Sequence, residues 1–88
     1  MKKTWRKINP PSDSLRKHYE NLFNRNQMKF MRRSKLETSH LGTEFTYSNT
    51  PFKLLGTIDA YEMVIESQLD GACYVVHCDE VTSMVLGN

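Results

Sequence analysis

Four residues whose side chains can bind metals or act as nucleophiles lie close together near the C-terminal end: Cys73, His77, Cys78 and Asp79. In an extended strand, alternate side chains point to opposite faces, so Cys73 and His77 are expected on one face and Cys78 on the other. The sequence has no second Cys or His pair at the spacing of a structural zinc site. It also lacks any sign of the oxyanion hole that a cysteine nucleophile needs. We therefore expect neither a metal site nor a catalytic site.

Other chemical motifs are missing as well. The sequence has no glycine-rich phosphate loop, no dinucleotide fingerprint and no EF-hand spacing. We therefore expect a protein that is not an enzyme, with no cofactor and no small-molecule substrate. Cys73 and Cys78 fall in one expected strand, about 17 Å apart at the rise of a strand, which is too far for a disulfide. Reduced thiols indicate a reducing compartment, the cytoplasm. No apolar run suits a signal peptide or a membrane span.

The distribution of charge is the most informative feature of the sequence. Residues 1–36 hold eleven of the twelve Lys and Arg and only two acids, a net charge of +9. Residues 37–88 hold the remaining lysine and eight acids, a net charge of −7. Such asymmetry between two parts of one chain indicates a polyanionic partner for the basic part.

The basic part therefore predicts binding to nucleic acid, because cations attract phosphates and release counterions. RNA or single strands are favoured over sequence-specific duplex reading, since no helix-turn-helix signature is present. For Trp5, which lies in a polar arm, stacking on a base and packing in the core are equally good interpretations. The expected nucleic-acid-binding residues are Lys2, Lys3, Trp5, Arg6, Lys7, Arg25, Lys29, Arg32, Arg33 and Lys35.

The N-terminal third of the chain reads as an arm followed by helix. Residues 1–11 form a charged arm that ends in two prolines, which block helix formation up to that point. Ser12 supplies an N-cap, and apolar residues then recur with helical spacing, which predicts a helix over about 12–24. The helical basic segment is expected to continue, with a second helix or a bend, to residue 36.

From Gly42 onward the pattern changes to short alternating strands. Strands are expected at about 44–47, 52–58, 61–66 and 72–78, with turns at Ser48–Pro51, Asp59-Ala60 and Asp70-Gly71 between them. Asp79-Glu80-Val81 predicts one helical turn, and a last strand is expected at about 82–86.

Over residues 42–86, this order of strands and turns resembles that of a known group of small domains. The resemblance rests on Gly42-x-x-Phe45-x-Tyr47, Phe52-x-Leu54-Leu55-Gly56, Asp70-Gly71 and Asp79-Glu80-Val81. These features resemble those of the small SH3-like barrels, the group that includes KOW and Tudor-type modules. The resemblance implies a five-stranded antiparallel barrel. The chain also looks like the accessory proteins that bacteriophages encode.

We therefore predict one α+β domain over residues 1–88, in which the basic helical segment packs beside an acidic SH3-like barrel or strongly twisted sheet at 42–86. An open sheet with the helix on one face is the alternative fold. The predicted function is non-catalytic binding of nucleic acid or a ribonucleoprotein. The alternative is a protein–protein adaptor or inhibitor, phage-encoded and directed at a host protein, that uses the acidic part. No membrane partner is expected.

Overall fold

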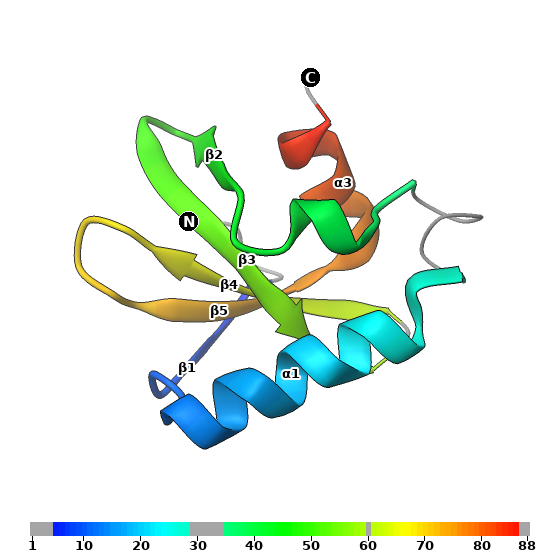
Figure 1. Cartoon of the computed structure of the whole chain (residues 1–88). Coiled ribbons are helices and arrows are strands. Elements are labelled where there is room, and N and C mark those ends of the chain that lie inside the picture. Colours follow the sequence, from blue (N-terminus) through cyan, green and yellow to red (C-terminus); the bar gives the residue numbers. More distant parts are fainter. Residues whose placement is uncertain (1–4, 29–34, 60, 87–88) are drawn as a thin grey trace.

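The computed structural model describes residues 5–28, 35–59 and 61–86. A first strand precedes a helix and a 3₁₀ turn, and four further strands in succession lead to a second helix (Figure 1). The elements are β1 (Arg6–Ile8), α1 (Asp13–Arg25), the 3₁₀ turn Thr38–His40, β2 (Glu44–Tyr47), β3 (Thr50–Thr57), β4 (Glu62–Ser67), β5 (Cys73–His77) and α3 (Cys78–Val85).

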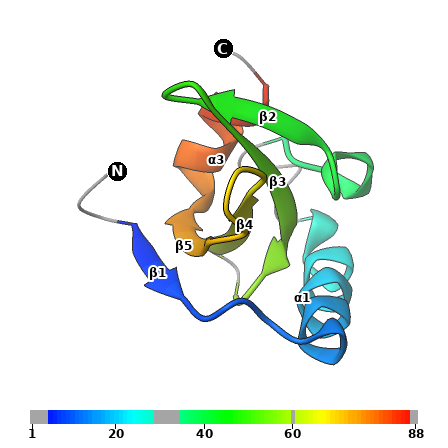
Figure 2. The same cartoon turned by 90° about the vertical axis from the view of Figure 1, so that its left-hand side faces the viewer.

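The five strands form one antiparallel sheet in the order β1-β5-β4-β3-β2. Two short strands, β1 and β2, lie at its opposite edges (Figure 2). Among the described residues these edges do not pair with each other, so the sheet is open. The expected closure into a barrel is therefore wrong, whereas the α+β class and a five-stranded antiparallel sheet are confirmed, with the sheet open as in the alternative fold.

The expected order, with a basic helical segment before all of the strands, is also wrong. The arm that the sequence predicts at residues 1–11 contains β1, which pairs with β5 in the register Arg6 to Val75 and Ile8 to Cys73. Three residues with one apolar side chain are too short for alternation to reveal a strand. The partner strand β5, whose residues are largely buried, supplies the hydrogen bonds that hold β1 in place.

The last strand expected, at about 82–86, is a helix instead. α3 runs from Cys78 to Val85, and the side chain of His77 caps it by accepting from the backbone N–H of Asp79 at 3.1 Å. Acidic residues in its first turn favour the positive end of the helix dipole. Cys78 and Val81, three residues apart, bury the same face of this helix.

The expected helix over about 12–24 corresponds to α1, Asp13–Arg25. The helical segment was expected to continue to residue 36. Lys35 is not helical, because its φ of 64° lies in the left-handed region. Asn26 ends α1, and its Nδ2 donates to the carbonyl of Leu22 at 2.8 Å. Residues 29–34 of the expected segment lie outside the described residues.

The two helices cover opposite faces of the sheet (Figure 1). The main core cluster includes Phe52, Met63 and Val76 from one face of the sheet and Val81 from α3. α1 packs on β3 from the other face, where Gly56 lies opposite Val64. A Cβ atom at Gly56 would lie 2.5 Å from the carbonyl carbon and oxygen of Tyr19, so only glycine allows this approach.

Candidate nucleic-acid interface

The side of α1 that faces the sheet is set by a few apolar and charged contacts. Phe23 is fully buried and belongs to the main core cluster, and Tyr19 is half-buried over Gly56. The helix begins where the Ser12 hydroxyl accepts from the backbone N–H of Leu15 at 3.2 Å. These contacts fix the rotation of α1, and they determine which side chains point to solvent.

The opposite side of α1 is exposed and polar throughout. Five exposed residues follow the spacing i, i+3, i+4, i+7 and i+11, which places them on one face of a helix. We call this set the α1 stripe: Ser14, Lys17, His18, Asn21 and Arg25. At a rise of about 1.5 Å per residue the stripe is about 16 Å long.

The acidic residues of α1 lie beside the stripe at Lys17, which lines the same cavity. Asp13 and Glu20 line a cavity of about 300 Å³ between α1 and β3, together with Arg16 and Leu54. Lys17 lies at the border, with its Nζ atom 3.6 Å from a carboxylate oxygen of Glu20. The stripe is therefore made of cations, hydroxyl, amide and imidazole groups.

A largely buried ion pair fastens α1 to the sheet. The Arg16 guanidinium donates to the carboxylate of Glu66 in β4, whose side chain is 15% exposed. Burial alone would raise the pKa of Glu66, but hydrogen bonds from Arg16 and Gln68 and the charges of Arg16 and Lys53 outweigh it and lower the pKa. The hydrogen bond to Glu66 in turn raises the pKa of Arg16. Arg16 therefore positions the helix, and its charge is compensated.

The expected nucleic-acid-binding residues fall at the two ends of α1. Arg6 and Lys7 are exposed on β1, which precedes the helix, and Arg6 lies 3.5 Å from Glu62. Arg25 is exposed in the last turn, and Lys35 is exposed beyond it. The remaining cations expected here lie outside the described residues: Lys2, Lys3, Lys29, Arg32 and Arg33.

The structure therefore does not gather the described members of the predicted site into one cluster. The four described cations divide between the start and the end of α1, and the α1 stripe runs between them. Lys17, His18 and Asn21 were not among the predicted site residues. The helical spacing of the apolar residues already placed Lys17 and Asn21 on the polar side of the expected helix, and the burial of Phe23 agrees with this.

Of the two interpretations of Trp5, the structure shows packing. The indole is 7% exposed, and its centroid lies 5.2 Å from that of Tyr47 and 5.7 Å from those of Phe52 and Tyr74. Its Nε1 donates to Glu80 at 2.7 Å. The ring is therefore enclosed by the protein and cannot stack on a base in this conformation.

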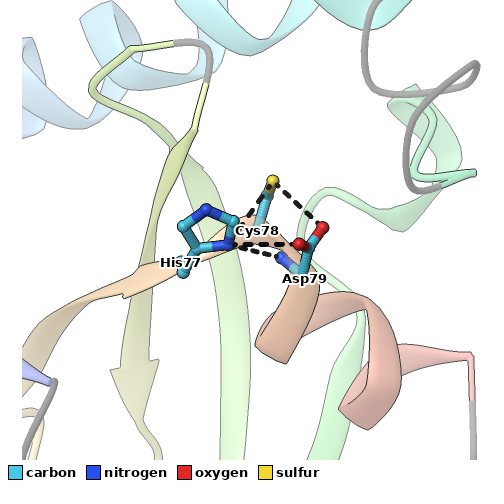
Figure 3. Close-up of side chains that lie close together, drawn as sticks. All are labelled: His77, Cys78 and Asp79. Atoms are coloured by element: carbon cyan, nitrogen blue, oxygen red, sulfur yellow. Dashed lines mark hydrogen bonds and ion pairs between the residues drawn. The ribbon is translucent and has the colours of Figure 1, made fainter.

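His77, Cys78 and Asp79 lie close together at the junction of β5 and α3 (Figure 3). As expected, Cys78 lies in the core on the other side from the exposed His77. Because the strand ends at His77, the Cys78 sulfur nevertheless lies 4.0 Å from the His77 Nδ1 atom. The three donor atoms lie within 4.8 Å of one another. However, Nδ1 already accepts from the Asp79 backbone as the N-cap of α3, and Cys78 is part of the core. The group has a structural role in starting α3.

The cysteines are both buried and are not joined in a disulfide. Burial and the nearby charge of Glu66 raise the pKa of the Cys73 thiol. A raised pKa lowers the fraction of thiolate, the form that acts as nucleophile and metal ligand.

Comparison with known proteins adds no family or relative. No protein-family model matches the sequence, and neither a curated protein nor a solved structure matches the chain. The resemblance to SH3-like modules and to phage accessory proteins stays a prediction. Within the described residues, neither helix has the length and apolar character needed to cross a bilayer.

Proposed function

We propose that the protein binds nucleic acid without catalysis, and that α1 is the centre of the binding surface. The observation that supports this proposal is the α1 stripe, an exposed helix face with cations and hydrogen-bonding groups and no acid. Exposed cations precede the stripe at Arg6 and Lys7 and follow it at Lys35. Cations along a helix face are the electrostatic footprint of a nucleic-acid-binding protein.

The pairing of charges inside the molecule also supports this assignment. Arg16 is engaged by Glu66 and therefore serves the fold, whereas Arg25 and Lys35 are exposed, and Lys17 is exposed with Glu20 at 3.6 Å. Phosphates that meet such exposed cations release counterions, so affinity falls steeply with salt.

The alternative is a protein–protein adaptor that uses the acidic part of the molecule. One of its acids, Glu66, is occupied by Arg16 within the fold. Fewer acids then remain to imitate a nucleic acid or to meet a basic partner. We therefore favour the basic surface and leave the adaptor as an outcome of the experiment below.

The test is a titration of labelled nucleic acids with the full chain at low and near-physiological salt. The variant Lys17→Gln/Arg25→Gln removes two cations from the stripe and should weaken binding to every probe. Its plot of log affinity against log salt should also become shallower, by about one unit per lost phosphate contact.

Lys53→Gln is the control, because it removes a cation from β3 rather than from α1. Equal binding by all three proteins would overturn the placement of the surface on α1. An absence of binding at low salt would overturn the function itself. A specific protein partner retained by the full chain after nuclease treatment would then support the adaptor.

A further inference from the structure

We infer that the ligand is double-stranded DNA and that α1 enters its major groove, with Asn21 facing the edges of the bases. This inference rests on the function proposed above and names the ligand class for the same surface. It departs from the preference for RNA or single strands that the sequence alone suggested.

The first reason is the position of the aromatic residues. Proteins that bind single strands combine a basic groove with exposed aromatic rings on which bases stack. Here Trp5 and Phe23 belong to the core, and Tyr19 lies half-buried against β3. None of the described Phe, Tyr or Trp side chains lies on the α1 stripe, so the stripe offers hydrogen bonds and charge rather than stacking.

The second reason is the shape of the surface. α1 lies on the outside of the sheet, where one of its sides packs on β3 (Figure 1). An α-helix with its side chains is about 10–12 Å wide, and the major groove of B-form DNA is about 12 Å wide. The major groove of A-form RNA is too narrow for this, which favours DNA over duplex RNA.

The third reason is the chemistry of the stripe from its centre outward. Asn21 lies near the middle, and an Asn amide can pair bidentately with the N6 and N7 atoms of adenine. Lys17 and Arg25 lie on either side of it, where they reach guanine edges or phosphates. Exposed cations also precede the helix at Arg6 and follow it at Lys35.

The experiment compares full-chain variants on three probes: a duplex DNA enriched for binding from a random pool, one of its strands alone, and an RNA duplex of the same sequence. The intact protein should bind the duplex DNA at least about tenfold more tightly than either other probe at the same salt. Asn21→Ala should weaken binding to the enriched duplex by on the order of tenfold. It should leave binding to an unselected duplex and the salt slope unchanged.

Asn24→Ala is the matched control, because Asn24 is also an exposed asparagine of α1 but its Oδ1 already accepts from Thr38 at 3.2 Å. Its affinity should remain within about twofold of the intact protein. Equal or tighter binding to the single strand or to RNA would overturn the inference and leave the proposed function standing. An Asn21→Ala variant that binds the enriched duplex normally would overturn the base-reading role. No binding to any probe would overturn both.

Discussion

The indole of Trp5 connects the first strand to the last helix. It packs on Tyr47, Phe52 and Tyr74 from three other strands, and it donates a hydrogen bond to Glu80 in α3. Because a buried indole N–H needs a partner, this hydrogen bond satisfies a group that would otherwise oppose burial. A residue that composition alone presents as part of a charged arm is thus one of the main contacts of the core.

Trp5 is the only tryptophan of the chain, so its fluorescence reports on this position alone. We expect a blue-shifted emission maximum that moves to the red on urea unfolding, at the same midpoint as the far-ultraviolet circular dichroism. Saturating duplex DNA should leave the emission unchanged, with a free tryptophan analogue as the control for light absorption by the probe. Strong quenching specific to the protein would instead show that the indole contacts the ligand.

Gly56 is the second residue on which the fold depends. Because a Cβ atom there would overlap the backbone of Tyr19, Gly56→Ala must push α1 away from β3. We expect the free energy of unfolding, measured in urea, to fall by about 3 kcal/mol or more.

Gly71→Ala is the control for that substitution. Gly71 has a φ of +75° but open space around its Cβ position. Its cost should be about 1 kcal/mol, that of the left-handed conformation alone. Equal losses for the two variants would show that contact with Tyr19 is not the limiting factor at Gly56.

At the scale of elements, the attachment of α1 to the sheet depends on pH through Glu66. Since the pKa of Glu66 is lowered in the folded state, the carboxylate contributes stability above its unfolded pKa of about 4.3, and this stability is lost as the pH falls further. Glu66→Gln should therefore be less stable than the intact protein at neutral pH. Its free energy of unfolding should also change less between about pH 5 and pH 3.

Glu62→Gln serves as the comparison in these acid titrations. The Arg6–Glu62 pair is more exposed than Arg16–Glu66, and exposed pairs contribute little to stability. A pH profile of Glu66→Gln that follows the intact protein would contradict the role given to this carboxylate.

Most of the helices and strands could be predicted from the sequence alone. α1 and the strands β2 to β5 follow periodic patterns of apolar residues, and their expected positions lie within a few residues of the observed ones. No such pattern predicted β1 or the full length of α3. β1 depends on its partner β5, and residues 82–86 contain apolar side chains that suit a strand or a helix equally well until Val81 is seen to pack in the core.

For the candidate site, the sequence revealed the charge asymmetry but not the arrangement of the cations in space. The sequence treats all cations of residues 1–36 alike, whereas the fold engages Arg16 with Glu66 and leaves Lys17 and Arg25 on the exposed side of the same helix. Such a distinction depends on which side of α1 meets the sheet, and therefore on tertiary packing.

At the scale of the whole molecule, we expect that residues 42–86 do not fold as an independent domain. A fragment that begins at Gly42 lacks β1, α1 and the core residues Trp5, Phe23 and Leu36. We expect it to show no cooperative thermal transition by circular dichroism. The full-length variant Arg6→Gln/Lys7→Gln should keep its transition, because it removes charge and preserves the strand; a cooperative transition in the fragment would contradict this view.

The pairing of β1 with β5 also bears on how the chain is made. Arg6 meets Val75, so one edge of the sheet joins segments that the ribosome synthesises at very different times. Until residues 73–77 have emerged, β1 has no strand to pair with. The first strand therefore stays unpaired during most of the synthesis of the chain. Contacts between segments so far apart in the sequence also slow folding.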